Sequence, residues 1–349
     1  MGRAFGSSAV CTEQVRSPRF SRRLHFHAPK SLGTIALVVL PPVWAYGWIA
    51  AKIGVADAPP FTVGALRNLG AALLLLLAAI VTRRPLRPKP LGWLVLLGLL
   101  QTTGMVGLSM WALEKGGAGQ TSVLAYTMPF WLLLLAWTFL GERIHGLQWA
   151  AVACALAGLV AVVSPWRLEG VMSSLLAVGS GLLWAASAVV VKLIRRRSSL
   201  NLLALTGWQM LFGALPLAVI ALLTSRVGPT WSGSFIASLS YLIVLSEALG
   251  WCLWLYVLAT LPASTAGIAV LATPVIATFV SWVQLGERPG GLEAAGMGLI
   301  LLALCVITLQ AILARAKRLN MAAVSAVAGA AVGQVNPGAP KDPVDLSGY

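Results

Sequence analysis

The chain has 349 residues, of which 58% are hydrophobic and 10% are charged. A soluble globular protein carries about 25% charged residues, so this composition excludes a large water-exposed globule and indicates a protein surrounded by membrane lipid. The net charge of +15 would suggest a nucleic-acid partner in a soluble protein. Here the basic residues gather in short loops and tails, so we expect no nucleic-acid partner.

Ten continuously apolar segments follow a polar N-terminal stretch. A helix of about 20 residues spans the hydrocarbon core of a bilayer, and unbroken apolar runs favour helices over a β-barrel. The predicted segments cover residues 33–53, 61–82, 92–113, 118–140, 147–164, 170–193, 200–224, 236–259, 263–285 and 291–313. They predict an all-α integral membrane protein with ten transmembrane helices. We expect residues 1–31 to form a basic cytoplasmic tail and residues 315–349 a disordered one.

The distribution of Lys and Arg predicts the orientation of the chain. With ten crossings and a cytoplasmic N-terminus, 19 of the 25 Lys and Arg residues fall on the cytoplasmic side and four on the outer side. The positive-inside rule therefore predicts a multi-pass protein of the inner (plasma) membrane with both termini in the cytoplasm.

One long stretch occurs twice. Residues 118–143 and 263–288 align with a constant shift, so that Pro129 matches Pro274 and both copies end in Gly-Glu-Arg. Such a duplication predicts two five-helix repeats, covering residues 32–165 and 169–314. Because five is odd, the second repeat would cross the membrane in the opposite sense. Inverted repeats with a binding site between them are typical of secondary transporters.

A second repeated pattern lies upstream, where Trp44-Ala45 and Lys52 match Trp184-Ala185 and Lys192. Two five-helix halves, a first helix with this pattern, and a fourth helix with a central proline and a Gly-Glu end resemble the drug/metabolite transporter superfamily, EamA type. The resemblance covers about residues 33–313. It implies ten helices around a central cavity, alternating access and export of small metabolites. The chain departs from the usual pattern at Pro41-Pro42 and at Glu247.

Glu247 lies deep inside the eighth apolar segment. An ionised carboxylate at the bilayer centre costs about 2.5–3.5 kcal/mol, so we expect Glu247 to face the interior of the bundle. There it would bind a substrate ammonium group or exchange a proton; the alternative is a neutral Glu hydrogen-bonded to another helix. We expect Arg67 to reach the outer interface or to pair with an acidic residue. Asp57 and Glu247 are the candidates, and depth in the membrane makes Asp57 the easier partner.

Aromatic residues at depth form a second group of candidates. Aromatic rings usually gather at the two membrane interfaces, so rings deeper in a segment indicate either a substrate cavity or helix packing. With Glu247, the predicted substrate-binding residues are Trp44, Tyr126, Trp184, Trp254 and Gln101.

Prolines and small residues predict how the helices bend and pack. Pro129 and Pro274 each leave a backbone carbonyl without its donor, which indicates a gating hinge or, alternatively, a fixed kink. Lys52 is expected to anchor its helix end at the interface. The small residues around Gly158 and Gly296 predict close helix packing, either within a half or in a homodimer.

The predicted function is a secondary transporter that exports small organic metabolites, such as amino acids or drug-like compounds, with proton coupling left open. No phosphate-binding loop is present, and the few Cys and His residues are dispersed, so we predict no cofactor and no metal. The alternative is a membrane-embedded lipid-modifying enzyme, which would need clustered His, Asp or Glu at one membrane face. The acidic residues are instead scattered, so we predict that the protein is not an enzyme.

Overall fold

The computed structural model describes residues 30–88, 90–140, 146–163, 170–197, 201–254 and 263–306, with residues 309–310, 313 and 321. Most of the predicted basic tail, the predicted C-terminal tail apart from Met321, and the first Gly-Glu-Arg sequence lie outside these residues.

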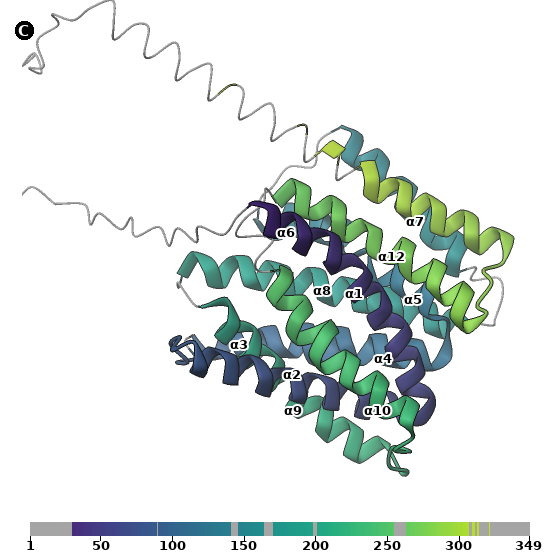
Figure 1. The fold of residues 1–349 in the computed structure, drawn as a ribbon. Helices are drawn as coiled ribbons and strands as arrows, with labels where there is room; N and C mark the ends of the chain where they lie inside the picture. The colour runs from purple at the N-terminus through teal and green to yellow at the C-terminus, as the bar shows by residue number, and fades with distance from the viewer. Residues whose placement is uncertain are drawn as a thin grey trace, which may run out of the picture.

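Within the described residues, every predicted apolar segment contains helix (Figure 1). Seven of the helical stretches are long and apolar enough to cross a membrane, and three are shorter. The predicted all-helical class is therefore confirmed. The elements up to residue 163 are α1 (Lys30–Asp57), α2 (Pro60–Val81), α3 (Leu91–Gly98), η1 (Leu99–Val106), α4 (Gly107–Lys115), α5 (Ala118–Ala125), α6 (Met128–Leu140) and α7 (Leu147–Val163). After it come α8 (Val171–Arg197), α9 (Leu202–Thr224), α10 (Gly233–Ser240), η2 (Tyr241–Leu249), α12 (Ala263–Leu285) and a helix over Gly291–Val306.

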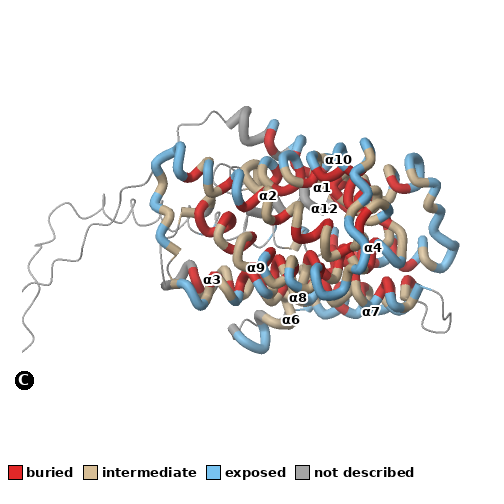
Figure 2. Tube along the Cα trace, turned by 90° about the horizontal axis from the view of Figure 1, so that it is seen from below, coloured by how far each residue is buried: buried red, intermediate tan, exposed pale blue. Residues whose placement is uncertain are grey.

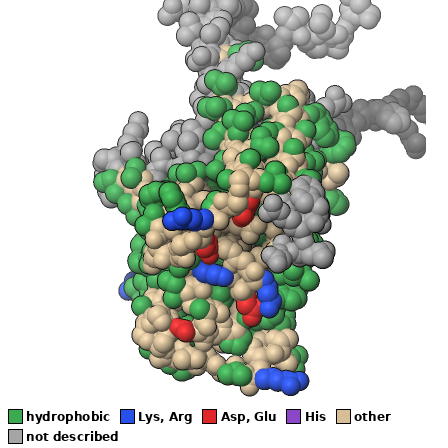
Figure 3. Space-filling model, turned by 90° about the vertical axis from the view of Figure 1, so that its right-hand side faces the viewer, with side chains coloured by type: hydrophobic (Ala, Val, Ile, Leu, Met, Phe, Trp, Pro, Cys, Tyr) green, Lys and Arg blue, Asp and Glu red, His purple; other side chains and the backbone are tan. Residues whose placement is uncertain are grey.

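The burial pattern is that of a helix bundle in lipid. Buried positions face the middle of the bundle and exposed ones face outward (Figure 2). Many exposed side chains are large and apolar, including Leu222 and Leu223, which are both 81% exposed. At one end of the bundle, acidic and basic side chains lie among uncharged polar atoms, while hydrophobic side chains cover the flanks (Figure 3). An apolar flank beside a charged end matches the layers of a bilayer.

Among the described residues, two helices contain a wider π-helical stretch that the sequence analysis did not anticipate. η1 continues α3 into α4, and η2 continues α10. The first residue of η2, Tyr241, follows the first residue of η1, Leu99, by 142 residues, which lies between the two shifts of the duplicated patterns, 140 residues for Trp44 and Trp184 and 145 residues for Pro129 and Pro274. Such π-helical turns are rare and occur often at functional sites.

Pro129 does not bend a continuous helix, and that part of the sequence interpretation is wrong. The helix ends at Ala125, turns through Tyr126 and Thr127, and a new helix begins at Met128. Pro129 therefore lies in the first turn of α6, where a missing backbone donor costs nothing because no intrahelical acceptor exists there. Pro274 does lie inside a helix, α12, as predicted.

The packing of the helices is reciprocal. α1 packs against α12 and η2, while α8, the counterpart of α1 in the duplicated pattern, packs against α5, α6 and η1. In the same way, α2 contacts η2 and α9 contacts η1. α2 and α9 also pack against each other (Figure 1).

Gly158 of α7 and Gly296 of the last helix form a close backbone approach. A Cβ on either residue would lie 2.7 Å from the carbonyl oxygen of the other. These two glycines therefore let α7 pack closely against the helix over Gly291–Val306. The predicted small-residue packing thus joins the two halves of the chain.

Lys52 and Glu287 tie helix ends together. The Lys52 ammonium donates to the carbonyl oxygens of Leu113 and Gly116 at 2.6 and 2.7 Å, so it caps the end of α4. Its role as an interfacial anchor stays a prediction. Gly286 ends α12 with a φ of +70°, the left-handed conformation that glycine adopts most readily. The Glu287 carboxylate that follows accepts hydrogen bonds from the N–H groups of Ala118 and Gly119.

Candidate functional site

A cavity of about 90 Å³ lies among α1, α2, η1, α4, α8, α9 and η2. Its walls therefore come from both parts of the duplicated chain. We call it the central cavity. It is lined by Trp44, Gly47, Trp48, Arg67, Asn68, Gln101, Thr102, Met105, Val106, Ser109, Met110, Tyr126, Trp184, Gln209, Met210, Ser246, Glu247 and Trp251.

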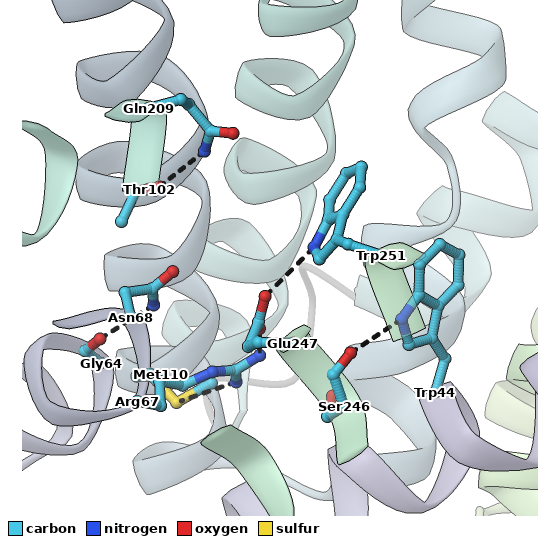
Figure 4. Close-up of polar contacts among 10 residues, drawn as sticks. All are labelled: Trp44, Gly64, Arg67, Asn68, Thr102, Met110, Gln209, Ser246, Glu247 and Trp251. Atoms are coloured by element: carbon cyan, nitrogen blue, oxygen red, sulfur yellow. Dashed lines mark hydrogen bonds and ion pairs between the residues drawn. The ribbon is translucent and has the colours of Figure 1, made fainter. Parts of the chain in front are cut away.

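An ion pair crosses this cavity. The Arg67 guanidinium on α2 donates through Nη2 to Oε1 of Glu247 on η2 (Figure 4). Both side chains are nearly buried, with 12% and 9% of their surface exposed. The indole Nε1 of Trp251 donates to the other carboxylate oxygen of Glu247 at 3.1 Å. Two opposite charges that share a buried cavity and a hydrogen-bonded neighbour offset much of their desolvation cost.

A neutral pair occupies the corresponding place in the other half. Gln209 on α9 follows Arg67 by 142 residues, and Thr102 on η1 precedes Glu247 by 145 residues. Both separations lie within the range of 140 to 145 residues by which the repeated patterns are shifted. The Gln209 amide donates to the Thr102 hydroxyl at 2.8 Å. The cavity thus carries a charged pair from α2 and η2 and a neutral pair from α9 and η1, as Figure 4 shows.

Aromatic rings complete the cavity wall in two groups. Trp44 on α1 donates from its indole nitrogen to the backbone carbonyl of Ser246 at 3.1 Å. Its ring centroid lies 5.8 Å from that of Trp251 and 5.9 Å from that of Trp254. The rings of Tyr126 and Trp184 meet edge to face at 5.4 Å. Such ring pairs combine apolar surface with polar edges, which suits an amphipathic ligand.

Five of the six predicted substrate-binding residues line the central cavity: Trp44, Gln101, Tyr126, Trp184 and Glu247. Trp254 is not a lining residue, although its ring packs against Trp44. The two predicted hinge residues, Pro129 and Pro274, do not line it either. The structure brings the five residues together; their role in binding stays a prediction.

The prediction that Arg67 prefers Asp57 as its partner is wrong. Asp57 accepts hydrogen bonds from the hydroxyl groups of Ser232 and Ser234, while Arg67 pairs with Glu247. The prediction compared only how deep the acidic residues lie in the membrane. It did not include the packing of α2 against η2, which brings Arg67 to Glu247. Sequence analysis also missed Trp251, which follows Glu247 by one helical turn and could have been found from that spacing.

Two polar atoms of the cavity lining are buried and have no hydrogen-bond partner among the described residues. They are Nε of Arg67 and Oγ of Ser109. Nη1 of Arg67 has the thioether sulfur of Met110 at 3.9 Å, which is a weak acceptor. Most buried polar atoms in folded proteins have a partner, so this part of the cavity has unused donor capacity.

The comparisons with known proteins agree on a transporter family. The model of the EamA-like transporter family matches residues 31–164 and again residues 171–309. A Bacillus subtilis protein described as "Uncharacterized transporter YoaV" is 27% identical over 74% of this chain and 89% of its own length. An Escherichia coli protein described as "Probable amino-acid metabolite efflux pump" is 27% identical over 78% of this chain and 93% of its own. One crystal structure shares the fold with a TM-score of 0.58 and 21% identity, over 80% of this chain and 98% of that one.

Proposed function

Because this chain belongs to the EamA-like transporter family, we propose that it is a secondary transporter that exports small organic metabolites by alternating access. The expected substrates are amino acids or drug-like compounds of similar size. The name of the Escherichia coli relative supports both the class of substrate and the outward direction.

The observation that carries this proposal is the buried ion pair in the central cavity. A charged Arg67 and a charged Glu247 are costly within a membrane, and a purely structural core is often at least as stable with apolar side chains of the same volume. Both charged groups lie beside aromatic rings in one cavity. Polar groups placed in an otherwise apolar pocket are typical of a site that orients a small ligand.

The reciprocal helix contacts support two inverted five-helix repeats. Exchanging the halves converts the contact of α1 with α12 into that of α8 with α5 and α6, and the contact of α2 with η2 into that of α9 with η1. A pseudo-two-fold axis through the cavity would produce this pattern. In transporters built this way, one half rocks against the other around a central site.

Glu287 and the two prolines would control access to the site. The Glu287 carboxylate from the second half holds the N-terminus of α5 in the first half, where the helix dipole favours a negative charge. We call this contact the Glu287 clasp. In the proposed cycle the clasp closes one end of the cavity, and Pro274 and the break before Pro129 allow α12 and α6 to bend.

Transport into proteoliposomes tests the proposal. The purified chain would be reconstituted and offered a panel of amino acids and other small metabolites, with and without a pH gradient. Counterflow of at least one compound above protein-free liposomes is expected. Dependence on the pH gradient would add proton coupling, for which Glu247 is the candidate group. If no member of a broad panel moves, the proposal fails.

A further inference from the structure

Arg67 uses only half of the edge with which it binds Glu247. The contact runs through Nη2, and the neighbouring Nε is buried without a partner among the described residues. In a guanidinium group, Nε and Nη2 lie on one edge and together bind a carboxylate through two parallel hydrogen bonds. A carboxylate that occupied both positions would thus make one more hydrogen bond with Arg67 than Glu247 makes.

Ser109 adds a second unused donor in the same cavity. Its hydroxyl is buried, lacks a partner within the described part of the chain, and lines the cavity together with Arg67. Two unpartnered polar groups in one cavity indicate a ligand that brings an acceptor. A carboxylate can accept from a guanidinium edge and from a hydroxyl at once, and among the small metabolites of the proposed function it is the acceptor that amino acids carry.

We propose that Arg67 and Glu247 recognise a zwitterion by exchanging their mutual contact for one contact with each end of the ligand. The ligand carboxylate binds Nε and Nη2 of Arg67 with help from Ser109, and the ligand ammonium group binds Glu247. This inference rests on the proposed transport function and narrows its substrate to amino acids with an apolar side chain, aromatic ones included.

The two buried charges of Arg67 and Glu247 require a ligand that carries both a negative and a positive charge. Separating Arg67 from Glu247 leaves one positive and one negative charge buried, and each needs a new counter-charge. A zwitterion supplies both, whereas a monoanion or a monocation leaves one charge unpaired. The Gln209–Thr102 pair on the other side of the cavity is neutral and cannot provide the missing charge.

The aromatic rings fit the same ligand. Trp251 already donates to Glu247, and Trp44 packs against Trp251, so an ammonium group on Glu247 would lie near indole rings that attract cations. Tyr126 and Trp184 provide apolar surface in the same cavity for the side chain of the ligand.

A set of three compounds tests the inference on the unmodified protein. Binding of L-phenylalanine, 2-phenylethylamine and 3-phenylpropanoate to the full chain in lipid nanodiscs would be measured by calorimetry. The second and third compounds each lack one charged group of the first, so neither is excluded by size. We expect the zwitterion to bind about tenfold or more tightly than either analogue, because each analogue leaves a buried charge unpaired. Equal affinities, or no binding of phenylalanine, would overturn the inference.

Two variants extend the test. Glu247→Gln leaves Arg67 as the single charge of the pair and should shift the preference towards 3-phenylpropanoate. Arg67→Gln leaves Glu247 and should shift it towards 2-phenylethylamine. The exposed control Arg87→Gln, which lies outside the cavity, should leave the order of the three compounds unchanged. An unchanged order in both charge variants would reject the inference.

The proposed function is judged separately. Transport of another compound from the broad metabolite panel, without binding of phenylalanine, would leave the transporter proposal standing and reject the zwitterion site alone. The comparison on the unmodified protein needs no substitution, so it decides the question even if a variant fails to fold.

Discussion

At the scale of single residues, the central cavity depends on Arg67 and Glu247 as a unit. Each buried charge is tolerated because the other is present, and Trp251 adds a hydrogen bond to the carboxylate. Removing one partner leaves an uncompensated charge in a low-dielectric environment, while removing both leaves an apolar cavity wall. The stability of the fold and the selectivity of the site therefore respond differently to single and double substitution.

The double substitution gives the first prediction. Arg67→Met or Glu247→Met alone should lower the free energy of unfolding by roughly 3–5 kcal/mol, whereas the double variant should lose less than either. Thermal or denaturant unfolding in detergent micelles measures this difference. Additive losses in the double variant would show that the two charges do not stabilise each other.

The sequence predicted correctly that Glu247 faces the interior of the bundle, but it did not predict that Glu247 pairs with Arg67. The energetic cost of a charge in lipid is enough to place this carboxylate inside the bundle, and no structure is needed for that step. The choice between Asp57 and Glu247 as partner of Arg67 depends on how α2 and η2 pack. That packing is set by contacts between distant parts of the chain, which hydropathy does not contain.

At the scale of helices, apolar length and proline predicted the segments, but not their internal geometry. η1 and η2 keep the hydropathy of ordinary helices while their hydrogen bonds run one residue further. Gln101 and Thr102 lie on η1, and Ser246 and Glu247 lie on η2. The wider turns thus coincide with the polar residues of the cavity, and no residue pattern in these segments indicated them.

The contact of α7 with the last helix gives a prediction at this scale. Gly158→Leu should lower stability by roughly 1–3 kcal/mol through overpacking, because a Cβ at this position would lie 2.7 Å from the carbonyl oxygen of Gly296. Gly298→Leu is the matched control, since a Cβ there has no neighbour within 4 Å. Unfolding temperatures of the two purified variants should differ; equal temperatures would show that α7 can move away at no cost.

The Glu287 clasp links the helix scale to transport. Its carboxylate joins the end of α12 to the start of α5. Glu287→Gln removes the charge that the N-terminus of α5 attracts, so this end of the molecule should open more often. A cysteine at Gln120, which lines the hollow beside Glu287, should then react several-fold faster with a soluble maleimide. The exposed control Glu114→Gln should leave the reaction rate unchanged, and a clasp variant that behaves like this control would remove Glu287 from the gate.

At the scale of the whole molecule, the reciprocal contacts and the paired residues have one common explanation. Arg67 with Glu247 and Gln209 with Thr102 lie at matching positions of the duplicated chain, and so do Trp44 and Trp184. Duplication alone would place such residues in two separate sites, one in each half of the chain. They meet in one cavity because the halves interlock, each contributing walls to the same space. An interlocked pair with opposite orientation can expose this space to either side of the membrane with little change inside each half.

The proposed opposite orientation of the halves gives the last prediction, which concerns the two Gly-Glu-Arg turns. In a background with Cys11, Cys154, Cys252 and Cys305 replaced by serine, a single cysteine would be placed at Arg143 or at Arg288. In the proposed topology an odd number of crossings separates the turns, so Arg288→Cys should react with a membrane-impermeant maleimide in intact cells. Arg143→Cys should react only after permeabilisation, as should Arg84→Cys in a loop that the positive-inside rule assigns to the cytoplasm. If the cysteines at 143 and 288 reacted from the same side, the halves would be parallel. The pseudo-two-fold axis through the cavity would then be lost, and the alternating-access proposal with it.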